Sequence, residues 1–193
     1  MRRGLDPATE AVMASISPTT RRLLDIQGFD GVDDHTLADT APWLRLAFGL
    51  CTLLAALGTV RASPGLLFAL VPIAVLGAAF PVHPFDLVYN LGVRHLTGTG
   101  PLPRRGAPSR FACGLGAVWL LAVGFAFLLG ADLVGYVLGG MLVAMGTLVS
   151  TIHVCIPSLV YRSIFGFPAK VGCAADDHPA RPTGSLGVGP TGA

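Results

Sequence analysis

Residues 111–152, FACGLGAVWLLAVGFAFLLGADLVGYVLGGMLVAMGTLVSTI, contain only one Asp, Glu, Lys or Arg side chain, Asp132. Residues 46–80 are similar, with Arg61 as their only charge. The hydrocarbon core of a bilayer takes about 20 apolar helical residues, so each stretch can hold two membrane-spanning helices with its charged residue at the turn. The sequence therefore predicts an all-α polytopic membrane protein, with four transmembrane helices arranged as two helical hairpins.

This pattern divides the chain into three parts. Residues 1–42 are expected to form a cytoplasmic N-terminal segment, and residues 43–166 the four-helix membrane domain. Residues 167–193, rich in Gly, Pro, Ala and Thr, are expected to be disordered. The predicted spans are about 43–60, 64–82, 111–129 and 133–152.

The composition of the whole chain agrees with a membrane protein. Hydrophobic residues make up 52% of the sequence and charged residues 12%, whereas a soluble globular domain carries about 25% charged residues. No apolar segment follows Arg2 and Arg3, so no cleavable secretory signal is predicted. The net charge of +2 gives no indication of nucleic-acid binding, and the lipid bilayer is the expected partner.

The positions of the basic residues predict the orientation. Cations near span ends are retained in the cytoplasm, which places both termini on the cytoplasmic side of the cell inner (plasma) membrane. The predicted far side carries only Arg61, and the near side carries twelve basic residues: Arg2, Arg3, Arg21, Arg22, Arg45, Arg94, Arg104, Arg105, Arg110, Arg162, Lys170 and Arg181.

Similar motifs open and close the two predicted hairpins, which favours an internal duplication. RLAFGL at 45–50 recurs as RFACGL at 110–115, 65 positions later. Duplicated hairpins of one orientation are related by a pseudo-twofold axis along the membrane normal, and sites in such folds tend to lie between the repeats. Each hairpin is followed by His, Pro and Leu-Val-Tyr: His83, Pro84 and 87–89 in the first, His153, Pro157 and 159–161 in the second.

The fourth predicted span carries small residues at helical spacing. Gly135 and Gly139 form a G-x-x-x-G pair, which allows close approach of helix backbones in lipid. The partner helix can belong to the same chain, to another membrane protein or to a second copy in a homo-oligomer, and the sequence leaves these alternatives open.

Outside the spans, the sequence predicts a short helix at about 7–26 and an interfacial helix at 83–95, whose apolar residues fall on one face. An irregular loop is expected at 97–109 because of its Gly and Pro content. Four aspartates lie between the predicted helix at 7–26 and the first predicted span: Asp30, Asp33, Asp34 and Asp39. They lack the spacing of a calcium-binding loop and are interpreted as part of a solvated linker.

A polar cluster is the one candidate site in the sequence. Counting along the spans brings the ends of the second and fourth helices to the same membrane face, together with Cys113 at the start of the third. Helical spacing places Asp86 and Asn90 on the face that carries His83. The candidate cluster is His83, Asp86, Asn90, His153 and Cys155.

Several interpretations of this cluster remain open. Imidazole, carboxylate and thiolate suit zinc or a related ion, although the C-x-x-C and H-x-x-x-H spacings are missing and no metal ligands are assigned. Cys155 suits a redox thiol if an imidazolium lowers its pKa, and His83, Asp86 and His153 suit a proton or small-solute path. The alternative is that these residues only anchor and cap helices. Cys51 is interpreted as an apolar filler.

The chain resembles a bacterial membrane family, catalogued as domain of unknown function 4395, over about residues 40–167. The motifs that carry the resemblance are 83–86, 89–90, 110–112, 155–158, Tyr161 and 165–166. The resemblance implies a four-helix membrane domain without an established activity. Some members end the last span with a C-x-x-C-like pair, which implies redox or sulfur handling, whereas here Ile156, Pro157 and Ser158 follow Cys155.

We therefore expect a structural or accessory membrane component. A cytoplasm-facing thiol-redox or metal-dependent site is the alternative, and transport of a small solute or protons is third. No nucleotide loop, G-x-S-x-G or H-E-x-x-H motif occurs, so no catalytic residue or cofactor is predicted.

Overall fold

The computed structural model describes residues 16–97 and 100–166, which contain helices and no strand. In chain order the helices are α2 (Pro18–Leu24), the π-helical turn η1 (Asp25–Phe29), α3 (Asp34–Val60), α4 (Pro64–Ala79), α5 (Pro84–Val88), the π-helical turn η2 (Tyr89–Val93), α6 (Arg94–Thr97), α7 (Ala107–Leu128), α8 (Asp132–Ile152) and α9 (Ile156–Phe165).

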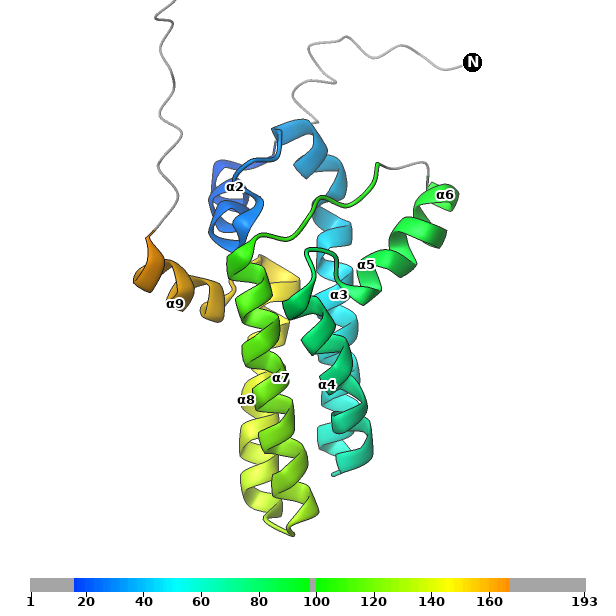
Figure 1. Cartoon of the computed structure of the whole chain (residues 1–193), viewed down its shortest axis with the longest axis vertical. Coiled ribbons are helices and arrows are strands. Elements are labelled where there is room, and N and C mark those ends of the chain that lie inside the picture. Colours follow the sequence, from blue (N-terminus) through cyan, green and yellow to red (C-terminus); the bar gives the residue numbers. More distant parts are fainter. Residues whose placement is uncertain (1–15, 98–99, 167–193) are drawn as a thin grey trace, which may run out of the picture.

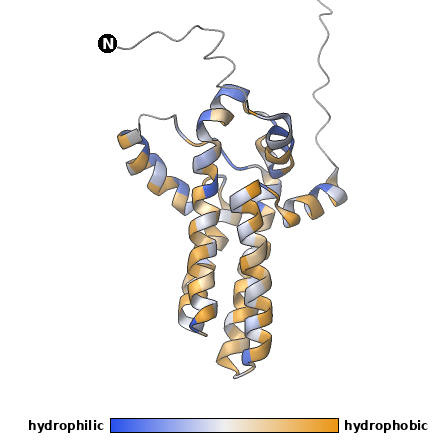
Figure 2. Ribbon diagram, turned by 180° about the vertical axis from the view of Figure 1, so that it is seen from behind, coloured by the Kyte–Doolittle hydropathy of each residue, from blue (hydrophilic) through white to orange (hydrophobic). Residues whose placement is uncertain are grey.

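The helices form a bundle with a head at one end (Figure 1). The bundle consists of α4, α7, α8 and most of α3, and the α3–α4 and α7–α8 connections lie at its far end. The shorter helices gather at the other end, where α6 and α9 point outward on opposite sides. Hydrophobic residues dominate the bundle, whereas hydrophilic residues are concentrated in the head (Figure 2).

Three helices are long and apolar enough on their own to cross a membrane: α3, α7 and α8. Helix α4 has 16 residues, or about 24 Å at 1.5 Å per residue. It is long enough to cross a membrane only when it is counted together with Pro84–Leu96, which follow after a bend of 83°. The prediction of an all-helical polytopic protein is confirmed, with three to four candidate spans among the described residues.

The bundle packs as two pairs, with α4 against α7 and α3 against α8. Small residues permit these close contacts. The Cβ of an alanine at position 124 would fall 2.5 Å from the Phe68 ring, and one at position 139 would collide with the Thr59 side chain. The apolar core between the helices includes Leu67, Val123 and Phe127.

The predicted G-x-x-x-G pair is buried inside the chain. Gly135 packs against the ring of Phe127 on α7, and Gly139 packs against Thr59 on α3. Both glycines therefore serve helix packing within one chain, and their surfaces are already covered.

Helix α3 begins nine residues before the predicted first span, because Asp33 of the expected linker caps it and Asp34 is its first residue. The Asp33 carboxylate accepts a hydrogen bond from the Thr36 amide at 2.8 Å, which caps the helix. The helix then continues through Pro42 to Val60. The predicted boundary after residue 42 falls inside this single helix.

The head has a hydrophobic core of its own, which the sequence analysis did not predict. Leu24, Phe29, Leu37 and Tyr89 are at most 1% exposed and pack together, with Leu44 and Leu102 in the same cluster. This core holds α2 and η1 against the first turns of α3. The predicted helix at 7–26 lies partly outside the described residues, and the predicted disordered tail lies wholly outside them.

Two arginines bind backbone carbonyl groups where the head meets the bundle. Arg110 donates to the carbonyl oxygens of Ala78 and Ala79, at 2.9 and 2.7 Å. Arg162 of α9 donates to those of Asp25 and Ile26, at 2.9 and 3.2 Å. Carbonyl groups at helix ends lack partners within the helix, so these contacts satisfy acceptors and fix neighbouring segments.

The segment before α7 is tied down by a buried ion pair. Arg105 donates through Nε and one Nη to the two Asp86 carboxylate oxygens, at 2.6 and 2.8 Å, and its amide donates to the Pro81 carbonyl oxygen at 2.8 Å. Both side chains are almost fully buried. The guanidinium carbon also lies 4.7 Å from the centre of the Phe48 ring.

We expect Arg105→Met to destabilise the protein by about 3–5 kcal/mol, because removing one partner leaves the Asp86 charge buried and unpaired. Denaturant unfolding of the purified protein in detergent measures this loss. Asp39→Asn is the matched control, because it breaks the exposed contact with His35 and is expected to change little. Equal effects of the two substitutions would contradict the assigned role of the buried pair.

Candidate functional site

The structure separates the predicted polar cluster into different environments. His83 and Asp86 form a capping box at the start of α5. The His83 amide donates to the Asp86 carboxylate at 3.3 Å, and the His83 Nδ1 accepts from the Phe85 amide at 3.3 Å. The carboxylate of Asp86 is therefore shared between this cap and Arg105.

The Asn90 side chain forms a hydrogen bond that involves no other residue of the predicted polar cluster. Its Oδ1 accepts a hydrogen bond from the Leu102 amide at 3.0 Å. This contact holds the segment after α6 against the turn η2. Asn90 therefore positions backbone in the head.

His153 ends α8 in the left-handed region, with a φ of 59°. Its Nε2 accepts from the Arg45 Nε at 2.8 Å, and its carbonyl oxygen accepts from the Gln27 side chain at 2.6 Å. The imidazole therefore joins α8 to α3, and the carbonyl group joins α8 to η1.

Cys155 precedes α9 and is buried. The Ser158 hydroxyl donates to its Sγ at 3.1 Å and lies 3.3 Å from the Pro108 carbonyl oxygen. Pro157 at the start of α9 removes a backbone donor that the first helical turn would leave unpaired. Cys155 is thus held at the junction of α8, α9 and the start of α7.

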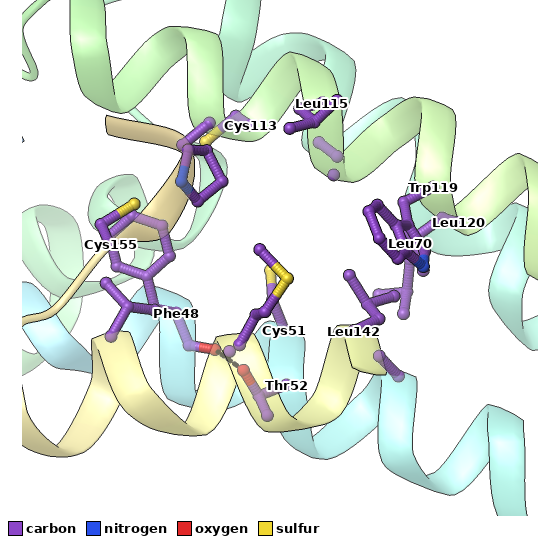
Figure 3. Close-up of a pocket in the computed structure, with 18 of the residues that line it drawn as sticks. Phe48, Cys51, Thr52, Leu70, Cys113, Leu115, Trp119, Leu120, Leu142 and Cys155 are labelled. Atoms are coloured by element: carbon purple, nitrogen blue, oxygen red, sulfur yellow. Dashed lines mark hydrogen bonds between the residues drawn. The ribbon is translucent and has the colours of Figure 1, made fainter. Parts of the chain in front are cut away.

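A cavity of about 140 Å³ lies in the bundle next to this junction, and three thiols line it. Cys51 comes from α3, Cys113 from α7 and Cys155 from the α8–α9 link. Figure 3 shows Cys113 and Cys155 at one end, Cys51 near the middle, and Trp119 with Leu70, Leu120 and Leu142 at the other end. His83 also lines this cavity, whereas Asp86, Asn90 and His153 do not.

Gly77 brings two of the cavity groups together. The position of a Cβ on Gly77 lies 3.0 Å from the His83 Nε2 and 3.3 Å from the Cys113 Sγ. The imidazole and the thiol therefore both pack against the backbone of α4, and any side chain at this position would displace the imidazole.

The ionisable groups at the head end of the cavity are neutral near pH 7. Burial lowers the pKa of His83 to about 4, and the charge of Arg105 contributes to the decrease. Burial raises the pKa of the Cys155 thiol, although hydrogen bonds with Ser158 act in the opposite direction. The redox interpretation of the sequence required an imidazolium that lowers the pKa of Cys155; instead, a neutral thiol faces the same cavity as a neutral imidazole.

No group of three or more His, Cys, Asp or Glu in the described part of the chain is arranged to hold a metal ion. The cysteines approach the cavity from separate elements, and Asp86 is already paired with Arg105. A metal at this site would require the side chains to move.

Sequence reasoning missed Arg105 as the partner of Asp86, and it interpreted Cys51 as a filler. The position of Cys113 in the motif that opens the second hairpin, three residues after Arg110, was the available indication that it lies near the candidate site. Nothing in the sequence spacing pairs Arg105 with Asp86, because the contact depends on how the loop returns over the head.

The two neutral histidines predict a pH dependence of stability. Burial also lowers the pKa of His153 to about 4, with the Arg45 charge contributing, whereas an unfolded histidine has a pKa of about 6.5. Between these values the unfolded chain binds more protons. The stability is therefore fully present above about pH 6.5 and is lost as the pH falls toward 4.

We expect the melting temperature in detergent to fall over this pH range. His83→Asn with His153→Asn should flatten the profile, because Asn can cap α5 and tolerates the left-handed conformation of position 153. His35→Gln is the control, since His35 is exposed. An unchanged slope in the double variant would exclude the buried histidines as its cause.

Comparisons with known proteins identify the chain only at the level of a family. No curated protein matches it, and no solved structure matches it. Residues 41–165 match the family described as domain of unknown function (DUF4395). The match includes α4, α5, α7, α8, most of α3 and the whole thiol-lined cavity. Because it covers more than half of the sequence and agrees with the resemblance noted above, the chain belongs to the DUF4395 family.

Proposed function

We propose that the chain spans a plasma membrane with its head, and both termini, in the cytoplasm. The distribution of arginine in the described residues supports this orientation, because Arg61 is the one arginine at the far end of the bundle. Arginines near span ends are retained on the cytoplasmic side. Those in or next to the head are Arg21, Arg22, Arg45, Arg94, Arg104, Arg105, Arg110 and Arg162.

Cysteine labelling tests this orientation. In a chain whose native cysteines are replaced by Ser, Thr19→Cys adds a thiol in the head and Ala131→Cys adds one at the far end; both positions are exposed. We expect a membrane-impermeant maleimide to label position 131 in intact cells and position 19 only after permeabilisation. The reverse pattern would overturn the orientation.

We also infer that the hairpins α3–α4 and α7–α8 are duplicated halves. The arginine that opens each hairpin contacts the end of the other: Arg45 binds His153 after α8, and Arg110 binds the last turn of α4. A twofold relation that exchanges the hairpins also exchanges the pairs α3–α8 and α7–α4, which are the two most extensive helix–helix contacts. The cavity lies between the halves, where sites are common in repeated membrane folds.

For the function itself, we propose a thiol site that undergoes reversible two-electron oxidation inside the helical bundle. The observation that carries this proposal is the convergence of Cys51, Cys113 and Cys155 on one cavity. These are three of the four cysteines in the sequence, and they come from distant segments. A purely accessory role, which the sequence favoured, does not account for this convergence.

The chemistry requires a small acceptor molecule that enters the cavity. Two S–H bonds break and one S–S bond forms, and the two protons and two electrons pass to the acceptor. Because Cys155 and His83 are neutral at rest, an acceptor that takes up protons together with electrons suits the site better than one that requires a thiolate. A cytoplasmic dithiol then gives two electrons and two protons to the disulfide, which breaks the S–S bond and restores the two thiols while the dithiol becomes a disulfide.

The transport alternative receives less support from the same contacts. A proton path was expected to use His83, Asp86 and His153. Asp86 is engaged by Arg105, His153 accepts from Arg45, and neither side chain reaches the cavity. Of these three groups only His83 is left facing an internal space.

Diamide, a small two-electron thiol oxidant, tests the thiol function. In a Cys173→Ser protein, we expect diamide to remove two thiols per chain and lower the intact mass by about 2 Da, without forming dimers. Ser substitution of Cys51, Cys113 and Cys155 one at a time identifies the pair, since two of these variants should lose the reaction. Three unreactive thiols in the folded wild-type chain would contradict the proposal.

A further inference from the structure

The size of the thiol-lined cavity limits its ligand to a small ring. Its volume is about 140 Å³, close to that of an apolar protein cavity of about 150 Å³ that binds benzene. Residues of α3, α4, α7 and α8 line it, and it is partly open to the outside of the bundle. A six-membered ring with short substituents therefore matches the available space.

The lining also limits the ligand to an uncharged molecule. No Asp, Glu, Lys or Arg side chain lines the cavity. A charged ligand would lose its hydration without a compensating ion pair, which is costly. An uncharged ring, in contrast, dissolves in the apolar interior of the bilayer and loses little hydration on binding.

Apart from the thiols, one side-chain N–H or O–H donor in the cavity lining remains for the ligand. The Thr52 hydroxyl donates to the Phe48 carbonyl oxygen at 2.7 Å, and the Trp119 indole donates to the Leu138 carbonyl oxygen at 3.0 Å. The His83 Nδ1 accepts from the Phe85 amide, so the proton of the neutral ring is on Nε2. Within the described residues no group accepts a hydrogen bond from this Nε2–H.

We propose that this cavity binds the ring of a lipid-soluble quinone, with the His83 Nε2–H donating to one ring carbonyl oxygen. The quinone combines the required properties: a six-membered uncharged ring, a carbonyl acceptor, and the capacity to take up two electrons with two protons. The redox reaction in this inference rests on the proposed thiol function. In it, two cavity thiols become one disulfide, and both quinone carbonyl groups become hydroxyl groups.

Duroquinone is a suitable probe, because its ring is small and carries four methyl groups that block addition of a thiol. Bound beside Trp119 it should quench the fluorescence of that residue, while Trp43 lies apart in the head core. Binding is measured on the purified chain with Cys51, Cys113 and Cys155 replaced by Ser, so that no redox reaction interferes. We expect saturable quenching in this protein.

Two variants and a second ligand distinguish the hydrogen bond from His83 from the fit of the ring in the cavity. His83→Asn keeps a cap for α5 and loses the Nε2–H, so the duroquinone affinity should fall about tenfold. Durene has the same methylated ring without carbonyl groups; its affinity, measured by competition, should not respond to His83→Asn. Gly116→Leu should abolish binding, because Gly116 lines the cavity and the added side chain would occupy space that the ring needs; a Cβ at this position meets no heavy atom within 4 Å, so the first added atom clashes with no neighbour.

Gly140→Leu is the control for Gly116→Leu, since Gly140 also has open space and lies outside the cavity lining. Equal quenching in both leucine variants would mean that duroquinone partitions into detergent, which would overturn the inference. Equal losses of durene and duroquinone in His83→Asn would overturn the carbonyl contact. In the protein with its thiols, one quinol should form per disulfide; diamide oxidation without duroquinone binding would leave the thiol function standing and reject the quinone.

Discussion

Backbone amide and carbonyl groups in a bilayer find no water, so every one of them needs a partner from the chain itself. In the bundle the helices satisfy this requirement internally. Where the helices end at the head, side chains supply partners for carbonyl groups that have none within their own helix. Arg110, Arg162 and Gln27 each donate to carbonyl groups at or next to helix ends, and the Asp86–Arg105 pair holds the last irregular segment before α7. The cavity depends on these contacts, because they position Cys155, His83 and the start of α7.

The parts of the fold that follow from long apolar runs could be predicted from the sequence. The all-helical architecture, the positions of the hairpin turns and the segment after α4 are of this kind, because length and charge determine them locally. The start of α3 could not be predicted in this way. The Asp33 cap is a local contact with Thr36. Leu37 and Leu44, in contrast, are buried only because α2, η1 and Tyr89 pack against them. Tyr89 follows Leu44 by 45 residues in the sequence, so no local pattern predicts its contact with α3.

Only part of the candidate site could be predicted, because the sequence gives the position of a residue along its helix and not its long-range contacts. Counting along helices brought His83 and Cys155 to one level, and both line the cavity. Depth alone carries no information about the direction of a side chain. His153 and Asp86 therefore lie at the depth of the cavity, but their side chains bind Arg45 and Arg105 and do not line it. Cys51 lies deeper along α3, yet it faces inward and belongs to the cavity. The protonation state of the site also depends on burial, which makes its thiol and imidazole neutral rather than an ion pair.

Helix α3 extends without interruption from the head core to the far end of the bundle. At 1.5 Å per residue its 27 residues measure about 40 Å, and the same rod carries Leu37 and Leu44 in the head and Phe48 and Cys51 at the cavity. One helix therefore joins the hydrophobic core of the head to a wall of the thiol-lined cavity. Pro42 lies between Leu37 and the cavity residues and removes one backbone hydrogen bond of the helix, so the place where α3 can bend separates the polar end of the protein from its buried thiols.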